Sequence, residues 1–291
     1  MDAITFTALG TIWNIRIDGK KIPENTKECL IGMVRRFERR FSRFLSENEA
    51  SAFCGSPAGR YPMPSPEFLT LLSKAKRLRE LTSGRFDPAV ASLLDHAGYN
   101  ASYRFSLDTA LENISVPKWD IVSDELLIDG PISFDFGGIG KGYCIDLVST
   151  FLKENEFFHH IVEAGGDIFA TEKIDGSPYK AGIEAPWQEG IIIGTVLLQN
   201  QGLAVSDRLK RKWGKWHHII DVKTKEPVME IMGCVAIARS AFDADSATSL
   251  IFFLNSEEVT NQTIDELGTE YLIFDKQGRA KKSSKWNWPL F

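Results

Sequence analysis

Hydrophobic and polar positions recur along this chain with two different periods. Residues 4–17 alternate in part and are rich in Thr and Ile, which predicts a first strand. Over residues 25–44, apolar side chains recur every three or four positions and the arginines fall mostly on the other face, which predicts a long amphipathic helix. A second helix is predicted over residues 67–82, and Ser83-Gly84 ends it.

The remaining segments are also strand-like or helix-like. Residues 119–136 predict two strands joined at Asp129-Gly130-Pro131, and residues 179–238 are mainly strand-like. The other predicted elements are a short helix after residue 85, helices over 142–155 and 241–254, and strands over 159–163 and 271–275. Because strands and helices are grouped rather than strictly alternating, we expect an α+β fold with a mixed, largely antiparallel sheet core and packed helices.

Composition is that of an ordinary globular protein. The chain has 291 residues, 43% of them hydrophobic and 25% charged. Its formal net charge of -5 argues against a nucleic-acid-binding protein, which normally carries a basic face. No apolar run is long enough to span a membrane. The first residues show no signal-peptide pattern, so we expect a cytoplasmic protein, although a chain whose export segment had been removed would look the same.

Basic residues gather in two places despite the negative total. The first cluster is Arg35, Arg36, Arg39, Arg40 and Arg43, and we interpret it as a solvated helix face. The second cluster is Arg208, Lys210, Arg211 and Lys212. It lies near other candidate site residues, so its role stays open.

A glycine-rich segment at residues 135–143 is the most informative motif. Its sequence, Asp-Phe-Gly-Gly-Ile-Gly-Lys-Gly-Tyr, precedes a predicted helix. Glycines let backbone amides approach a ligand, a helix N-terminus attracts anions, and Lys141 adds a positive charge, so the segment indicates a phosphate site. It is not a P-loop, since Asp135 replaces the first glycine and Gly142 follows the lysine. The alternative is a turn that only caps a helix.

Two further motifs follow predicted strands or lie in them. Gly165-Gly166-Asp167 could bring backbone and a carboxylate to a ligand, and the alternative is a turn with an Asp cap. His217 and His218 lie in a strand-like run at residues 216–221, so they point to opposite faces and at most one enters a given site. A neutral imidazole is the commonest general base, and the alternative is a pair of sheet-edge histidines. For His159-His160 we favour a structural role.

Two motifs near helix ends complete the set. Asp245 and Ser249 are four residues apart and share one helix face, and a carboxylate with a hydroxyl suits Mg²⁺ shared with substrate phosphates. The alternative is helix capping by Asp243 or Asp245. Residues 82–88 could line a pocket, and the alternative there is a turn with proline at the first helical position.

Together, these motifs resemble those of the FAD:protein FMN transferase family, also called the ApbE family. Residues 135–142 resemble the family's "DLGGIAKG", and residues 164–168 reproduce "AGGDI". The weaker matches, in chain order, are Gly10-Thr11, residues 42–44 with 48–49 ("SRF…SE"), 83–88 ("GxFDP"), 218–221 ("HIxDP") and 244–249 ("ADALATA"). The whole series in the right order identifies the chain as a member of this family.

The resemblance implies a fold and a reaction. It implies an ApbE-like flavin transferase domain over residues 1–291, either as one body or as two lobes with the FAD site between them. Members use Mg²⁺, cut the pyrophosphate of FAD, move FMN onto a Ser or Thr hydroxyl of an acceptor flavoprotein and release AMP. The acceptor usually carries a short flavinylation motif of the type Ser/Thr-Gly-Ala-Ser/Thr.

The resemblance also implies roles for residues. Lys141 and the glycines, Gly137 and Gly138 among them, would hold the diphosphate, and His218 would take the proton of the acceptor hydroxyl. Asp245 and Ser249 would ligate Mg²⁺, with a backbone carbonyl near Gly138 as a third ligand. The flavin nucleotide pocket would be shaped by Phe86, Asp87, Gly165, Gly166, Asp167 and Ser206.

The chain departs from the family pattern at several positions. Ser249 replaces a Thr and keeps the hydroxyl, whereas Val222 replaces a proline and Lys225 a glycine. Val205-Ser206-Asp207 stands where the family often has Thr-Ser-Gly, and Cys54 where it has Asn. These changes put substrate positioning and rate in question more than the fold.

Two other functions use the same residues. The first is a Mg²⁺-dependent FAD pyrophosphatase, in which water replaces the acceptor hydroxyl. The second is a non-catalytic flavin-binding protein. The presence of His218, Lys141 and Asp245 together favours an enzyme, because a binding protein has no evident use for a base beside a metal site.

Overall fold

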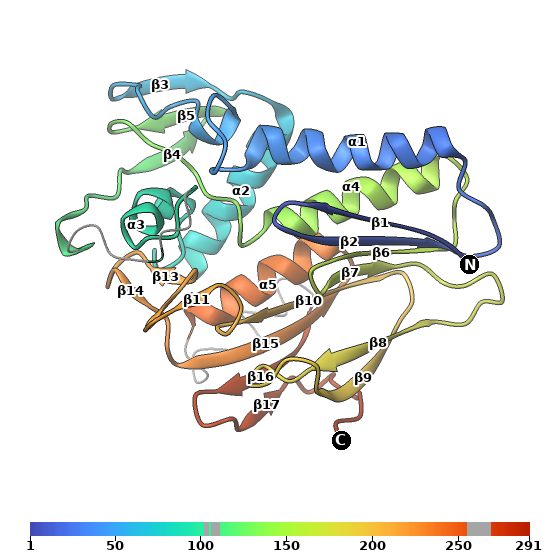
Figure 1. Cartoon of the computed structure of the whole chain (residues 1–291). Coiled ribbons are helices and arrows are strands. Elements are labelled where there is room, and N and C mark those ends of the chain that lie inside the picture. The colour runs from blue at the N-terminus through green and yellow to red at the C-terminus, as the bar shows by residue number, and fades with distance from the viewer. Residues whose placement is uncertain (102–104, 106–110, 255–268) are drawn as a thin grey trace. The chain divides into compact units, whose positions relative to one another are not determined.

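The computed structural model describes residues 1–101, 105, 111–254 and 269–291 (Figure 1). These residues group into two compact units. The first unit comprises Met1–Glu38, Ile139–Asp207 and Glu230–Phe291, and the second comprises Arg39–Gly138 and Arg208–Met229. The prediction that the FAD site lies between two lobes stays a prediction.

The first unit is built on an eight-stranded sheet in which all neighbouring strands are antiparallel. The strand order is β1-β2-β6-β7-β10-β15-β16-β17. The bounds are β1 Asp2–Ala8, β2 Thr11–Ile17, β6 His160–Ala164, β7 Asp167–Ala170, β10 Gln201–Asp207, β15 Ile231–Ala238, β16 Glu270–Asp275 and β17 Ala280–Lys282. The predicted α+β fold with a largely antiparallel sheet core is therefore confirmed.

Helices cover one face of this sheet and a hairpin covers the other. Helices α4 (Gly140–Glu154) and α5 (Ala241–Phe253) pack together, and α5 lies on β10 and β15. Every residue of α5 from 244 to 253 is buried, and this run includes four polar residues, Asp245, Ser246, Thr248 and Ser249. On the opposite face, β8 (Tyr179–Glu184) and β9 (Ile192–Leu198) contribute side chains to a core that includes Leu203, Val235 and Phe274. This packing fixes the first turn of α4 against α5.

The second unit has short elements. Its helices are α2 (Pro66–Leu81) and α3 (Ala91–His96), with one-turn helices η1 (Glu49–Ser51), η2 (Pro88–Val90) and η3 (Leu111–Asn113). Its strands are β3 (Gly59–Pro62), β4 (Trp119–Val122), β5 (Glu125–Ile128), β11 (Lys212–Trp213), β12 (Trp216–His217), β13 (Ile220–Asp221) and β14 (Glu226–Pro227). Helix α1 (Glu24–Phe41) begins in the first unit and ends in the second.

Tight turns account for two predictions that were wrong. The predicted first strand is two strands, because Leu9 and Gly10 both have positive φ and close a two-residue hairpin. The hairpin within residues 119–136 turns at Ser123-Asp124, also at positive φ, and not at Asp129-Gly130-Pro131. Asp129 instead accepts a hydrogen bond from the Lys118 N–H at 2.7 Å.

The predicted run at residues 216–221 is also interrupted. Strand β12 ends at His217 and β13 begins at Ile220, so His218 lies between two strands that pair with different partners. The predicted helix over 25–44 ends earlier, at Phe41. The helices predicted over 67–82, 142–155 and 241–254 are confirmed to within two residues.

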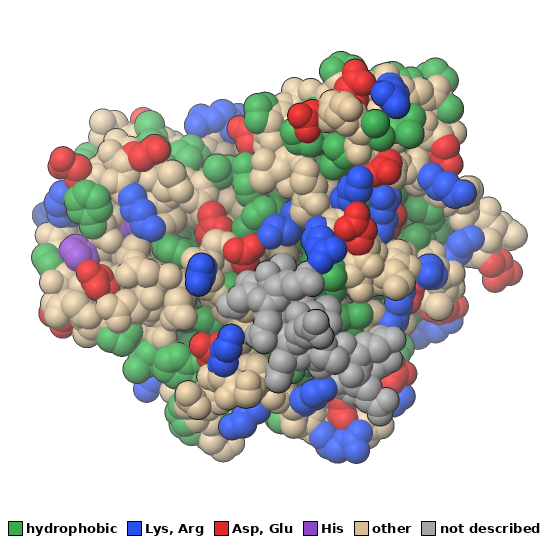
Figure 2. Space-filling model, turned by 180° about the vertical axis from the view of Figure 1, so that it is seen from behind, with side chains coloured by type: hydrophobic (Ala, Val, Ile, Leu, Met, Phe, Trp, Pro, Cys, Tyr) green, Lys and Arg blue, Asp and Glu red, His purple; other side chains and the backbone are tan. Residues whose placement is uncertain are grey.

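The surface carries charges of both signs, and Figure 2 shows them interspersed over one face, with hydrophobic side chains singly and in small groups between them. In the part of the chain that the structure describes, no helix combines the length and the hydropathy needed to cross a membrane.

Candidate active site

In the first unit, Lys141 lies in the first turn of α4 between two buried carboxylates. Its ammonium group forms an ion pair with the carboxylate of Asp167, and its Nζ lies 3.9 Å from Oδ1 of Asp245. The side chains of Asp167 and Asp245 are 1% and 4% exposed, and that of Lys141 is 20% exposed. A lysine with two carboxylates in a low-dielectric setting is held in place by them.

Gly142 brings α4 and α5 into direct contact at this point. Its N–H donates to Oδ2 of Asp245 at 2.9 Å. A Cβ at Gly142 would lie 2.3 Å from the Ala241 carbonyl oxygen and 2.7 Å from the Asp245 Cβ, so only glycine fits. This glycine therefore serves helix packing and the orientation of Asp245.

Asp167 is held by backbone on its other side. It begins β7 directly after Gly165-Gly166, whose positive φ values of 60° and 99° close the tight turn from β6. Its Oδ1 accepts the Val205 N–H at 3.1 Å. The paired glycines thus form the turn that the alternative interpretation predicted, and the same turn places Asp167 beside Lys141.

Ser206 lies on the helix-facing side of β10. Its hydroxyl donates to Oγ1 of Thr248 at 3.0 Å, and Thr248 in turn donates to the carbonyl of Asp245 at 2.9 Å. A chain of hydrogen bonds therefore connects Ser206 to the backbone that carries Asp245.

The proposed metal ligands of the first unit fit a hard cation. Asp245 and Ser249 lie one turn apart on α5 and are 3% and 9% exposed, so a carboxylate and a hydroxyl oxygen are brought together in a largely dry setting. Among the described residues, no group of three or more His, Cys, Asp or Glu side chains could hold a metal. Mg²⁺ would complete its shell with substrate phosphate, water or backbone oxygens, as it does elsewhere.

In the second unit, the start of the glycine motif is anchored by Arg43. The guanidinium is 4% exposed; its Nε donates to Oδ2 of Asp135 at 2.6 Å and its Nη1 to Oδ1 of Asp95 at 2.6 Å. Oδ1 of Asp135 accepts the Gly137 N–H at 2.5 Å. A Cβ at Gly137 would lie 2.7 Å from that oxygen. Arg43 therefore orients, through Asp135, the backbone that leads to Gly138.

His218 lies beside a group of aromatic rings. The Tyr99 ring centroid is 6.4 Å from that of His218 and stacks on Trp213 at 5.7 Å. Arg43 also contacts Tyr99, with Cζ 5.0 Å from the ring centroid. The neighbouring His217 is 2% exposed, and its two ring nitrogens bond to the Val228 carbonyl and the Ile219 N–H. Both ring nitrogens of His217 are therefore engaged by the backbone.

Phe86 and Asp87 have structural contacts. Phe86 is 7% exposed, and its N–H donates to the Thr82 hydroxyl at 3.1 Å. Asp87 is the N-cap of η2 and accepts the Trp119 Nε1–H at 2.8 Å. Burial raises the pKa of Asp87, opposed by these hydrogen bonds and Arg79. The capping turn that the alternative interpretation described is present here.

A sequence profile of the ApbE family matches residues 9–273. The chain belongs to the ApbE family. It is similar to the FAD:protein FMN transferase of Haemophilus influenzae, with 24% identity over 95% of this chain and 87% of the relative. The corresponding protein of Klebsiella pneumoniae is 24% identical over 79% of this chain and 77% of that relative. The prediction that the chain is an enzyme, a transferase of this family, is confirmed.

Solved structures show the same fold. The ApbE protein of Thermotoga maritima superposes with a TM-score of 0.82 at 24% identity, covering 97% of this chain and 96% of that one. The flavin transferase ApbE of Vibrio cholerae gives a TM-score of 0.80 at 21% identity, with coverage of 97% and 96%.

Within this ApbE-family chain, the sequence interpretation missed Arg43 and Asp135 as site-supporting residues. Arg43 was assigned to a solvated helix face, but it lies beyond the end of α1 and is buried. Arg43 is the arginine of the "SRF" match to the family, and this match was the sequence feature that could have marked it as a site-supporting residue. Lys225 has φ +58° where the family has glycine, so the turn keeps its left-handed conformation with a side chain in place.

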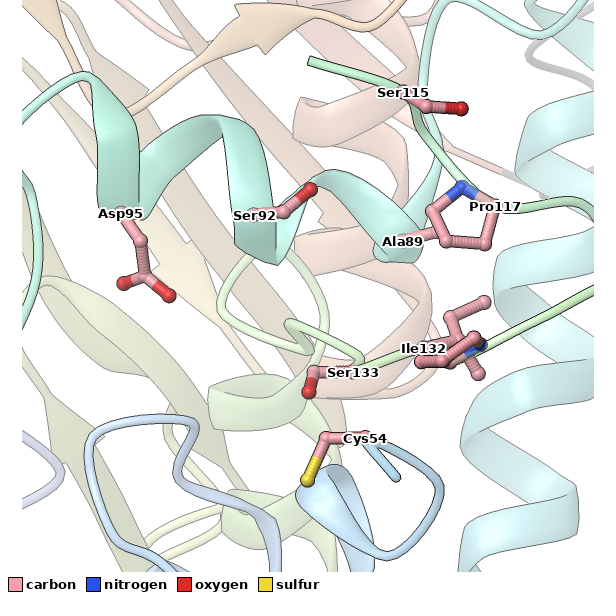
Figure 3. Close-up of a pocket in the computed structure, with 9 residues that line it drawn as sticks. Cys54, Ala89, Ser92, Asp95, Ser115, Pro117, Ile132 and Ser133 are labelled. Atoms are coloured by element: carbon pink, nitrogen blue, oxygen red, sulfur yellow. The ribbon is translucent and has the colours of Figure 1, made fainter. Parts of the chain in front are cut away.

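A pocket of about 220 Å³ lies elsewhere in the second unit (Figure 3). It is lined by Cys54, Ala89, Ser92, Asp95, Ser115, Pro117, Pro131, Ile132 and Ser133. None of the predicted site residues line it. Two of its lining residues contact residues described above: Asp95 accepts a hydrogen bond from Arg43, and Ala89 donates its N–H to Asp87.

Proposed function

We propose that this ApbE-family protein transfers FMN from FAD to a Ser or Thr hydroxyl of an acceptor flavoprotein, releases AMP and depends on Mg²⁺. The observation that carries the proposal is the buried cluster of Lys141, Asp167 and Asp245 at the start of α4. The names of the H. influenzae and K. pneumoniae relatives support the choice of donor and product.

The first unit would bind the charged part of FAD. Lys141 is positioned by two carboxylates and would attract the diphosphate oxygens, while the first turn of α4 adds the partial positive charge of a helix N-terminus. Asp167, held by the Val205 N–H, would accept hydrogen bonds from the nucleotide. Gly165, Gly166 and Ser206 would lie along this part of the ligand.

Asp245 and Ser249 would hold Mg²⁺, together with a backbone carbonyl near Gly138. Bound there, the ion would neutralise the charge that builds on phosphoryl oxygens. The contact from the Gly142 N–H fixes the orientation of the Asp245 carboxylate before any ligand arrives. In the second unit, Asp135 does the same for the Gly137 amide.

His218 would take the proton of the acceptor hydroxyl. That oxygen then forms a bond to the FMN phosphorus, the bond from this phosphorus to the bridging oxygen breaks, and AMP leaves with that oxygen on its phosphate. The rings of Tyr99 and Trp213 would keep the imidazole oriented. Phe86 and Asp87 would support the pocket wall through the contacts described above.

The test is AMP release from FAD, measured by chromatography with Mg²⁺ or EDTA and with or without an acceptor flavoprotein. We expect AMP together with a covalently fluorescent acceptor, both lost in EDTA and in His218→Ala. The matched control is His159→Ala, a half-buried histidine whose ring binds the Glu172 carbonyl.

Other outcomes have defined meanings. AMP without labelling of any acceptor would favour the pyrophosphatase, in which water accepts the phosphoryl group. Absence of AMP under every condition, with tight FAD binding, would contradict the proposed transfer. The cytoplasmic location expected from the sequence stays a prediction, which fractionation of producing cells tests.

A further inference from the structure

One segment of the second unit carries a charge opposite to that of the rest of the chain. Residues 208–229 contain seven Lys or Arg residues and two acidic ones, a formal charge of +5. Because the whole chain carries -5, the other residues together carry -10. The seven basic residues are Arg208, Lys210, Arg211, Lys212, Lys215, Lys223 and Lys225.

These charges lie on a folded scaffold that also carries His218. The segment forms two hairpins, β11–β12 and β13–β14, and His218 lies between β12 and β13. Trp213 and Trp216 bury their rings in a core with Leu93 and Leu94, and the Trp213 Nε1–H donates to the Ala97 carbonyl at 2.9 Å. Lys212, Lys215, Lys223 and Lys225 thus lie on hairpins fixed by packing, and Arg208, Lys210 and Arg211 directly precede β11.

The segment itself contributes two acidic residues, Asp221 and Glu226. Asp221 already accepts the Arg85 Nε–H at 2.7 Å, and Arg85 comes from outside the segment. Glu226 pairs with Lys215 at 3.4 Å, but both side chains are more than half exposed, so this pair contributes little. Lys210, Lys212 and Lys223 are exposed, and we call these three the basic surface.

We propose that the basic surface docks an acidic segment of the acceptor flavoprotein; this inference rests on the proposed function. An acceptor must bring its hydroxyl to His218, and a local positive field beside that residue steers a negative segment there. The negative remainder of the chain repels the same segment from other places. Exposed lysines on hairpins suit steering and registration, whereas the FAD diphosphate is assigned to Lys141.

The experiment compares two acceptor peptides that share a Ser-Gly-Ala-Thr core and are flanked by three Glu or by three Lys residues. The variant is the triple charge reversal Lys210→Glu, Lys212→Glu and Lys223→Glu. Its matched control reverses three exposed arginines of the other basic cluster, Arg35→Glu, Arg36→Glu and Arg39→Glu. Labelling rates with FAD and the FAD affinity are measured at low and high salt.

We expect the wild type to label the Glu-flanked peptide roughly ten-fold or more faster at low salt, and the preference to shrink at high salt. The triple variant should lose or invert the preference while its FAD affinity changes less than about two-fold, and the control variant should keep the preference. A preference that survives in the triple variant, or is lost equally in the control, would overturn the docking surface.

Three further results would also decide the matter. Tighter binding of duplex DNA than of the Glu-flanked peptide would overturn the choice of partner. Failure of the wild type to label either peptide or an acceptor flavoprotein, with FAD bound, would overturn the proposed function and the docking surface with it. Labelling of both peptides at equal rates would overturn the docking surface alone.

Discussion

The candidate residues of the two units are held in different ways. In the first unit, Asp245 and Asp167 are oriented by backbone N–H groups of Gly142 and Val205, which belong to long, packed elements. In the second unit, the motif backbone and the surroundings of His218 depend on side chains. A single guanidinium, that of Arg43, contacts both Asp135 and Tyr99.

This difference has a physical consequence. A carboxylate bound to backbone amides of a helix and a sheet keeps its position as long as those elements stay packed. A loop and an aromatic ring that share one buried cation lose their arrangement when that cation is lost, because two carboxylates are then left close together. Substitutions of the site side chains should therefore affect function locally in the first unit and affect both function and stability in the second.

The largest expected effect tests function without loss of fold. Asp245→Asn keeps an oxygen that can accept the Gly142 N–H but removes the charge proposed to bind Mg²⁺. We expect AMP release from FAD to fall roughly 10³-fold, equivalent to about 4 kcal/mol, with urea unfolding nearly unchanged. Asp243→Asn, at the N-terminus of the same helix, is the control. Retention of Mg²⁺-dependent turnover in Asp245→Asn would contradict the metal assignment.

The second prediction concerns Arg43. Arg43→Gln leaves Asp135 and Asp95 without their cation, so the free energy of unfolding should fall by about 3–5 kcal/mol. Arg40→Gln is the matched control, because Arg40 also pairs with two carboxylates but its side chain is 36% exposed, and it should cost about 1 kcal/mol or less. Arg43→Lys should fold and show a raised KM for FAD. Equal losses of stability in Arg43→Gln and Arg40→Gln would contradict the greater importance of the buried Arg43.

The third prediction tests the close contact of the helices in the first unit. Gly142→Ala places a methyl group against the Ala241 carbonyl and the Asp245 Cβ, so α4 and α5 must separate. We expect a loss of about 1–3 kcal/mol in thermal or urea unfolding and weaker Mg²⁺ dependence. Gly130→Ala, where a Cβ meets nothing within 4 Å, should leave stability almost unchanged. If both variants behave alike, the helices do not constrain Asp245.

The fourth prediction concerns two buried groups of the first unit, Asp146 and His160. Asp146 caps α5 through the Ala241 and Phe242 N–H groups, and burial raises its pKa to about 6. His160 bonds to Ser149 and the Phe157 carbonyl, and burial lowers its pKa to about 4. The structural role predicted for His160 is consistent with these contacts.

The two groups act on stability with opposite signs. Folded Asp146 retains a proton between pH 4 and 6 that the unfolded chain releases, so its contribution falls as the pH rises through that range. Below about pH 6.5, His160 binds a proton in the unfolded chain but stays neutral in the folded chain. Its contribution to the free energy of unfolding therefore falls as the pH drops toward 4. Asp146→Asn should therefore steepen the loss of stability on acidification by about 1–3 kcal/mol, and His160→Gln should flatten it. Urea unfolding at pH 4.5 and 7 measures the pH dependence of stability in both variants. If this dependence in Asp146→Asn equals that of the wild type, the raised pKa of Asp146 does not contribute to it.

Much of the candidate site was predictable from local sequence. The helices that carry Lys141 and Asp245 follow from apolar spacing and end signals, which act over a few residues. The glycine pair before Asp167 predicted a turn, and it is one. Hairpins at Leu9-Gly10 and Ser123-Asp124 were missed because neither pair is a strong turn signal, and pairing of the strands on either side stabilises the positive φ values.

The sequence by itself determined the family, the α+β class and the identity of the chemical groups, because these depend on residue types and short-range order. Only the tertiary structure decided which of those groups meet. Lys141 and Asp167 are 26 residues apart, Gly142 and Asp245 are 103 apart, and Arg43 and Asp135 are 92 apart. Such contacts form when long-range packing brings distant segments together. A local sequence pattern therefore does not predict which buried charged residues will pair.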